Sequence, residues 1–218
     1  MLAEDGVFVW GRDTRRRPRV VVFANEKGGT GKTTLALHTI IALHKLGYRV
    51  ASVDMDVRQT SLSLYLQNRV DYGRQVGIAL GGPEQHVPLR LSGRASEATS
   101  LAGAAARVRE AFQVAEDADF LIVDTPGADT LPGRLAVANA DVLLTPVNDS
   151  LLDLSVVAHL DPARHVAPAP SIVTKAVWDQ NRMREAVGRA PIDWLLVRNR
   201  LAALPSRNTR DIDRLLPR

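Results

Sequence analysis

The sequence predicts an α/β fold with a mainly parallel central sheet and helices on both of its faces. Short apolar runs that suit buried strands alternate with longer segments of helical spacing along the 218 residues, and this alternation is typical of parallel sheets. A glycine-rich turn joins the first apolar run to the first helical segment. The length suits one domain with a sizeable core.

The spacing of apolar residues predicts the individual elements. Strands are expected at residues 20–24, 49–53, 120–123, 142–144 and 194–197. Helices are expected at residues 33–46, ending before Gly47, and at residues 102–116. Residues 67–100 are polar and rich in glycine, which indicates a long segment outside the regular alternation of strands and helices. Three prolines indicate a later loop, namely Pro162, Pro168 and Pro170.

Polar side chains stand where four of these strands end. They are Asn25, Asp54, Asp124 and Asn199. Ligands of parallel α/β sheets bind beyond the carboxyl ends of the strands, so these four residues are expected to share one site.

Composition excludes several classes of protein. The chain has no cysteine, which excludes disulfides, cysteine zinc sites and thiolate-held iron–sulfur clusters. No segment has the roughly 18 unbroken apolar residues of a membrane helix. Glu4 and Asp5 precede the first apolar stretch and three arginines follow it, so a secretory signal is not expected. We therefore expect a cytoplasmic protein.

Basic residues are concentrated near the ends of the chain, whose formal net charge is +4. Residues 175–218 carry ten basic and five acidic side chains, whereas residues 20–174 carry thirteen and sixteen. A basic surface attracts polyanions such as DNA, but a solvated basic surface without a ligand explains the charge about as well. The candidate DNA contacts are Arg200, Arg207 and Arg210.

Residues 25–34 have the sequence of a phosphate-binding loop. They read Asn-Glu-Lys-Gly-Gly-Thr-Gly-Lys-Thr-Thr and lie between a strand and a helix, which is the context a P-loop requires. Glycines let backbone N–H groups surround phosphate oxygens, and the helix N-terminus adds positive charge. Lys32 is expected to reach the β- and γ-phosphates and the Thr33 hydroxyl to coordinate Mg²⁺. The expected nucleotide-binding residues are Lys27, Gly28, Gly29, Thr30, Gly31, Lys32, Thr33 and Thr34.

The loop departs from the usual P-loop pattern at two positions. Glu26 stands where glycine is usual, and Lys27 adds a second lysine. This K-G-G-x-G-K-[ST]-T pattern resembles the deviant Walker A loop of the ParA/MinD superfamily of P-loop NTPases. The resemblance implies that Lys27 reaches across an ATP-bound homodimer to the partner's nucleotide, much like an arginine finger. The absence of cysteine excludes the nitrogenase iron-protein branch.

Two acidic motifs complete the expected site. Asp54 and Asp56 follow the second strand; such a pair is often a turn or a helix cap, but here it comes one crossover after a P-loop. The resemblance implies that Asp56 positions the attacking water and that Asp54 supports the Mg²⁺ shell. Asp124 looks like the Walker B aspartate and is expected to hold Mg²⁺ through water. Gly127 would let the following loop respond to the γ-phosphate.

Asn199 is the expected adenine contact. MinD-like proteins read adenine with an asparagine in this place, and the amide offers both a donor and an acceptor.

Four segments resemble, more narrowly, the MipZ family of division-site regulators. They are residues 25–29, 54–60, 145–150 and 193–202. The resemblance implies an ATPase domain at residues 19–218 and a basic N-terminal extension at residues 1–18. The family continues past the position of Arg218, so the domain is expected to be either truncated at its C-terminal end or that of a shortened relative.

The resemblance implies an ATP-driven switch with ATP and Mg²⁺ as cofactors and slow hydrolysis. Its ATP-bound form would be a homodimer that binds chromosomal DNA non-specifically, which would place it on the nucleoid. FtsZ, whose assembly the dimer inhibits, and ParB are the implied protein partners. Residues 211–218 are too short for an amphipathic membrane helix and contain Pro217, so membrane binding is not expected.

Three alternatives stay open. The P-loop does not separate MipZ from ParA, so a ParA-like chromosome or plasmid partitioning ATPase is the main alternative. A metabolic P-loop enzyme, such as a dethiobiotin-synthetase-like ligase, would need a pocket for a small acceptor beside the γ-phosphate. The intact Lys32, Asp56 and Asp124 argue against a protein that only binds nucleotide.

Overall fold

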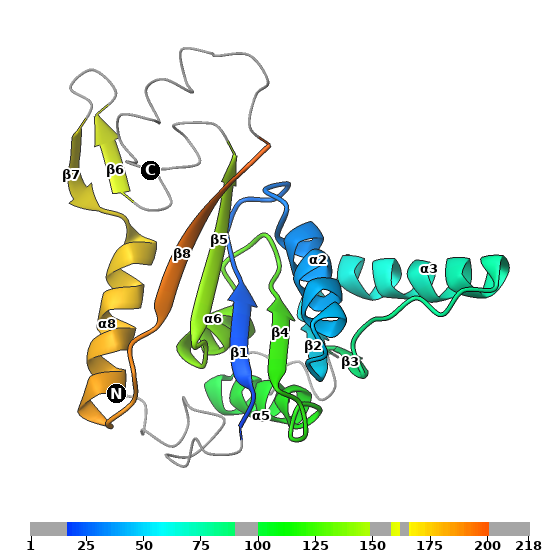
Figure 1. Cartoon of the computed structure of the whole chain (residues 1–218). Coiled ribbons are helices and arrows are strands. Elements are labelled where there is room, and N and C mark those ends of the chain that lie inside the picture. Colours follow the sequence, from blue (N-terminus) through cyan, green and yellow to red (C-terminus); the bar gives the residue numbers. More distant parts are fainter. Residues whose placement is uncertain (1–16, 90–99, 149–157, 162–165, 201–218) are drawn as a thin grey trace.

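The structure is a computed structural model that describes residues 17–89, 100–148, 158–161 and 166–200. Its main sheet has the strand order β3-β2-β4-β1-β5-β8, and all neighbouring strands are parallel (Figure 1). These strands are β1 (Arg19–Phe23), β2 (Val50–Asp54), β3 (Gln85–Pro88), β4 (Phe120–Asp124), β5 (Val142–Asn148) and β8 (Asp193–Asn199). Two further strands, β6 (Ala158–Asp161) and β7 (Val166–Pro170), form a separate antiparallel pair.

Helices cover both faces of the main sheet, which confirms the predicted fold class. They are α2 (Lys32–Lys45), α3 (Ser61–Val76), α5 (Leu101–Gln113), α6 (Leu131–Ala138) and α8 (Ile172–Ala186). On one face α2 and α3 contribute buried apolar side chains such as Ile40 and Leu62. On the other face α5, α6 and α8 contribute Phe112, Leu135 and Val177 to a larger core.

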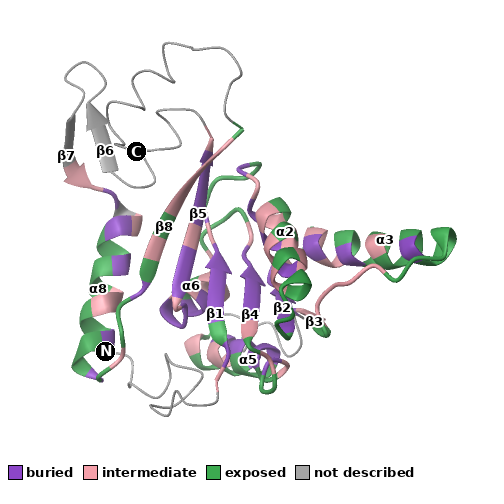
Figure 2. Ribbon diagram, in the orientation of Figure 1, coloured by how far each residue is buried: buried purple, intermediate pink, exposed green. Residues whose placement is uncertain are grey.

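The central strands are apolar because both faces of the sheet are covered. Every residue of β2 is buried, as are four of the five residues of β1 and of β4 (Figure 2). Buried parallel strands read as continuous apolar runs, which is why the sequence predicted them. The strands expected at residues 142–144 and 194–197 were too short. β5 and β8 run on to Asn148 and Asn199, because they pair along their whole length.

The prediction that residues 67–100 lie outside the regular strands and helices is wrong in part. α3 continues to Val76, and β3 adds an edge strand to the sheet. Figures 1 and 2 show α3 extending away from the sheet with much of its surface exposed. It buries only Leu62, Leu66 and Gly73, so its apolar face is too narrow to give a clear helical period.

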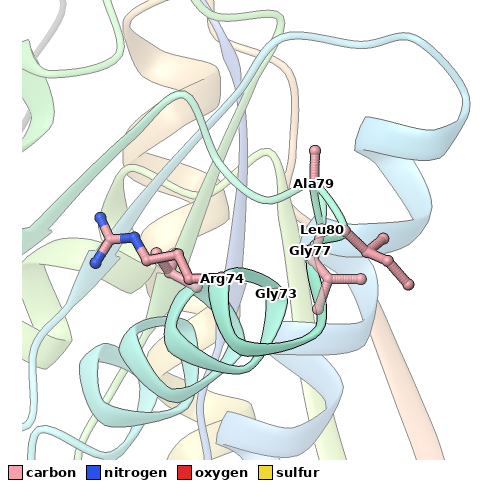
Figure 3. Close-up of a pocket in the computed structure, with 7 residues that line it drawn as sticks. Gly73, Arg74, Gly77, Ala79 and Leu80 are labelled. Carbon is pink, nitrogen blue, oxygen red and sulfur yellow. The ribbon is translucent and has the colours of Figure 1, made fainter.

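A shallow pocket of about 300 Å³ lies where α3 ends (Figure 3). The chain turns at Gly77, with φ of +68°, and the Ile78 N–H donates to the Gly73 carbonyl at 2.9 Å. A Cβ on Gly73 would lie 2.6 Å from the Ile78 carbonyl oxygen, so the close return requires glycine. Arg74 is the charged residue of the lining, and the other lining side chains are apolar or absent. The pocket therefore offers little polar chemistry.

The loop predicted around the later prolines is also wrong in part. Pro168 and Pro170 lie in β7, where a two-stranded pair leaves room for residues without an N–H. Pro162 lies outside the described residues. No helix was predicted from the sequence at α3, α6 or α8. Among the described residues, no helix has both the length and the apolar content needed to cross a membrane.

Candidate nucleotide-binding site

The phosphate loop joins the end of β1 to the start of α2. Gly29 and Gly31 have φ values of +74° and +98°, a region that glycine adopts without strain. α2 begins at Lys32, directly after Gly31, and no side chain caps its first turn. Uncapped N–H groups at a helix N-terminus favour an anion. The loop therefore has a backbone conformation and donors suited to phosphate.

Lys32 is the first residue of α2, directly after the loop, and is only 7% exposed. Its ammonium donates to the Lys27 carbonyl at 3.1 Å. Burial lowers the pKa of Lys32, and the carboxylates of Asp124 and Asp56 act against this shift. The charge of Lys32 thus interacts with the carboxylates of Asp124 and Asp56. Lys27, by contrast, has an exposed side chain.

Asn25 braces the loop against the sheet. Its Nδ2 donates to the carbonyl of Pro146 in β5 at 2.7 Å, and its Oδ1 accepts the Lys27 N–H at 2.9 Å. The side chain is buried. Asn25 therefore fixes the backbone of Lys27, a role that the sequence analysis did not assign.

Asn199 reaches the same loop from the end of β8. Its Nδ2 donates to the Thr30 carbonyl at 2.8 Å, and its Oδ1 accepts the Arg200 N–H at 2.9 Å. A Cβ on Gly31 would collide with this amide. The structure thus brings Asn199 to the site, while its contact with adenine stays a prediction. Of the candidate DNA contacts, Arg200 follows β8, and the other two lie outside the described residues.

Asp124 is a buried carboxyl group at the end of β4. Its pKa is raised to about 7, chiefly by burial. The charges of Asp54 and Asp56 also raise this pKa, whereas a hydrogen bond from Thr33 and the charge of Lys32 lower it. Among the described residues, Asp124 Oδ1 has no hydrogen-bond partner although it is buried. A spare carboxylate oxygen beside a threonine hydroxyl suits a hard dication.

Among the described residues, few side chains near Asp124 could also bind a metal ion. The described residues contain no group of three or more Asp, Glu or His side chains that could hold a metal on their own. Mg²⁺ with nucleotide phosphates needs only one or two protein carboxylates. The residues present therefore fit the predicted cation.

The turn after β2 is held by Asp54. Its Oδ1 accepts the Asp56 N–H at 3.1 Å, and its Oδ2 accepts both the N–H and the hydroxyl of Ser63 at 3.0 Å. Asp56 Oδ1 in turn accepts the N–H groups of Arg58 and Gln59 at 3.2 and 3.0 Å. Both oxygens of Asp54 are thus engaged within the protein, which favours a supporting role over direct metal contact.

The loop between β4 and α6 lies against the phosphate loop. Thr125 donates both its N–H and its hydroxyl to the Phe23 carbonyl, at 3.1 and 2.9 Å. A Cβ on Gly127 would lie 3.1 Å from the Gly28 Cα. Thr130 then caps the first turn of α6. Movement of the phosphate loop would therefore act directly on this second loop.

A cavity of about 390 Å³ lies between this second loop, α6, β5 and α8. Its walls are mainly apolar, with Leu143 and Val177 among them, and the charged residues of its lining are Glu26, Asp129 and Arg134. The last two form an ion pair with each other. Asn25 and Glu26 are part of this lining, so the cavity adjoins the phosphate loop.

Comparison with known protein families decides the assignment. The family model described as ATPase MipZ matches residues 19–218. The chain belongs to the MipZ family. The recognition made from the sequence motifs is thereby confirmed.

Individual relatives of this MipZ-family chain agree over shorter stretches. It is 48% identical over 56 residues to a putative septum site-determining protein MinD from Guillardia theta, an alignment that covers 25% of this chain and 21% of the relative. The chain thus matches only about a fifth of that curated relative.

Solved structures show the same fold. A plasmid partition protein from Borrelia burgdorferi has a TM-score of 0.57 and 15% identity, covering 92% of this chain and 85% of its own. Cobyrinic acid a,c-diamide synthase from Mycobacterium smegmatis, with bound ATP analogue and magnesium, has a TM-score of 0.59 and 19% identity, covering 89% and 80%. The MipZ-family chain therefore has the P-loop NTPase fold.

Proposed function

We propose that this chain is a molecular switch that dimerises with ATP, hydrolyses it slowly and regulates division placement by inhibiting FtsZ assembly. The main observation behind the proposal is that Lys32, Thr33 and Asp124 interact with one another beside the phosphate loop. The second lysine of this loop, Lys27, is exposed. Membership of the MipZ family supports ATP as the nucleotide. Coupling to ParB and to the chromosome belongs to the same proposal.

The loop and its neighbours would bind magnesium and the triphosphate. Amides at the start of α2 favour negative charge, and Lys32 would exchange its contact with the Lys27 carbonyl for the β- and γ-phosphates. Thr33 and Asp124 would hold Mg²⁺, with Asp54 fixing the adjacent turn. When bound, Mg²⁺ would neutralise the negative charge that develops on the phosphates.

Asp56 would orient the attacking water. Its position is set by the turn to Arg58 and Gln59, and its charge acts on Lys32, the residue that would bind the β- and γ-phosphates. Lys27 of a second copy would add positive charge where the transition state spreads negative charge. Slow hydrolysis would then set the lifetime of the dimer.

The ATP-bound dimer would bind DNA through its basic C-terminal region, which would place it on the nucleoid. The candidates are Arg200, Arg207 and Arg210. Contacts to phosphate give an affinity that falls steeply as salt rises. A titration of the ATP-bound protein with DNA at several salt concentrations tests this part, and an affinity independent of salt would contradict it.

FtsZ assembly separates this proposal from the ParA-like alternative. FtsZ polymerisation would be followed by sedimentation and light scattering with this chain plus ATP and Mg²⁺, with Lys32→Ala as the nucleotide-free control. We expect the ATP-bound chain, and not the control, to reduce polymer. If the chain binds DNA with ATP yet leaves FtsZ polymer unchanged, the partitioning function replaces the proposed one.

A further inference from the structure

A chain of hydrogen bonds links β3 to the turn that carries Asp56. The Ser52 hydroxyl lies 2.9 Å from His86 Nδ1, and His86 Nε2 lies 2.8 Å from the Ser63 hydroxyl. Ser63 donates to Asp54 Oδ2 at 3.0 Å, and Asp54 Oδ1 accepts the Asp56 N–H at 3.1 Å. The chain therefore runs from an edge strand to the backbone of Asp56.

The protons in this chain determine the tautomer of His86. Ser63 has one hydroxyl proton, which goes to Asp54, so His86 Nε2 must supply the proton of its own bond to Ser63. In the neutral ring Nδ1 is then an acceptor, and the Ser52 hydroxyl donates to it. Every member of the chain has a matching partner. Burial lowers the pKa of His86, with Asp54 acting against this shift, which agrees with a neutral ring.

The sheet and α3 hold the members of the chain in place. Ser52 and His86 are register partners in β2 and β3, so their side chains stand on the same face of the sheet. Ser63 lies in the first turn of α3, and its N–H also donates to Asp54. Without a donor from His86, the Ser63 oxygen would lose the proton that it accepts, and the hydroxyl would be held only by its own donation to Asp54.

We propose that His86 is a positioning residue for ATP hydrolysis, which acts through Ser63 and Asp54 to hold the turn that carries Asp56. This inference rests on the proposed function, in which Asp56 orients the attacking water. His86 has no contact with the phosphate loop in the hydrogen bonds of the described residues. Its loss should therefore slow the hydrolysis step without weakening nucleotide binding.

Steady-state ATPase kinetics of His86→Leu and His86→Gln test this role. The amide nitrogen of Gln can take the place of Nε2 and donate to Ser63, whereas Leu cannot. We expect kcat to fall about tenfold in His86→Leu, a loss typical of removing a residue that orients an active-site side chain through a hydrogen bond. KM and ATP affinity should change little. His86→Gln should recover most of kcat. Gln85→Ala, at an exposed neighbour on β3, is the matched control and should keep wild-type rates.

Two outcomes of the kinetics would overturn the proposal. Wild-type kcat in His86→Leu would show that the contact does not matter. Equal losses in His86→Leu and His86→Gln would show that His86 acts only through packing. Thermal melts would establish that each variant is folded.

The tautomer of His86 can be measured without ATPase activity. Nitrogen-15 NMR of the imidazole rings in the wild-type chain should show His86 neutral and protonated at Nε2; a ring protonated at Nδ1 would overturn the proposal. If the wild-type chain hydrolyses no ATP while the NMR shows the expected tautomer, the proposed function fails and the hydrogen-bond chain itself stands.

Discussion

Gly127 of the loop after β4 packs directly against Gly28 of the phosphate loop. A Cβ at position 127 would lie 3.1 Å from the Gly28 Cα and 3.5 Å from the Lys32 ammonium. Gly127 does not have a positive φ, so alanine would be tolerated by the backbone and opposed only by this contact. The pair therefore connects the nucleotide site to α6 through two glycines.

Gly127→Ala should separate the two loops by a few tenths of an ångström. We expect weaker ATP-dependent dimerisation and slower hydrolysis, because the loop can no longer close on the phosphates. Gly82→Ala is the control, since a Cβ there meets no atom within 4 Å. Light scattering and phosphate release would measure both effects. Wild-type behaviour of Gly127→Ala would show that the contact has no part in the switch.

Lys27→Ala should retain ATP binding and lose the ATP-dependent dimer. The Lys27 N–H bonds to Asn25 and the Lys27 carbonyl bonds to Lys32, and alanine keeps both backbone groups, so the loop conformation should be retained. Lys32→Ala is the contrasting variant and should lose ATP binding itself, because it removes the charge at the β- and γ-phosphates. Calorimetric titration and sizing by light scattering distinguish the two. A dimer of normal affinity in Lys27→Ala would refute a role in trans.

Asp56→Ala should accumulate the ATP-bound dimer. Asp56 is placed by a turn, whereas the predicted nucleotide contacts belong to the phosphate loop, so binding should persist while the water is no longer oriented. We expect phosphate release to fall by about 10²-fold or more. A normal rate of phosphate release would exclude the water-positioning role.

Asp124→Asn should stabilise the protein in the absence of nucleotide and Mg²⁺. The folded protein raises the pKa of Asp124 from 3.8 to about 7, so the free energy of unfolding falls as pH rises through this window, where the folded state binds more protons. Asparagine cannot ionise. We expect a gain of about 2 kcal/mol at pH 8 and little gain at pH 4.

Urea unfolding at the two pH values measures this difference for Asp124→Asn. Hydrolysis by the same variant should be lost, since the carboxylate predicted to hold Mg²⁺ is gone. An equal stability change at both pH values would show that ionisation of Asp124 is not the cause.

Motifs that are local in sequence were predictable, and contacts between distant segments were not. The phosphate loop could be located because strand, glycine turn and helix follow one another directly. The ends of β2 and β4 could be located because an aspartate closes each apolar run. The roles of Asn25 and Asn199 as braces depend on β5 and β8 lying beside the loop. The contact between Ser52 and His86 depends on the edge strand β3, which has no buried residue. The sequence therefore has no apolar pattern from which β3 could be predicted.

Arg184→Met should be among the most destabilising single substitutions in the described part of the chain. Arg184 is 1% exposed and donates to the carbonyls of Ala138, Ala140 and Ala190 at 3.1, 2.6 and 2.7 Å. Methionine fills a similar volume but removes the donor from the buried carbonyls of Ala138 and Ala140. We expect a loss of about 3–5 kcal/mol in the free energy of unfolding.

Arg74→Met is the matched control for Arg184→Met. Arg74 pairs with Asp71 at 3.4 Å, but both side chains are more than half exposed, so its loss should cost less than about 0.5 kcal/mol. Urea unfolding of the two variants compares the same chemical change in a buried and an exposed setting. Similar losses in the free energy of unfolding for both variants would mean that the carbonyls at the end of α6 find other donors. Arg184 would then not be the residue that holds α8 against that end of the sheet.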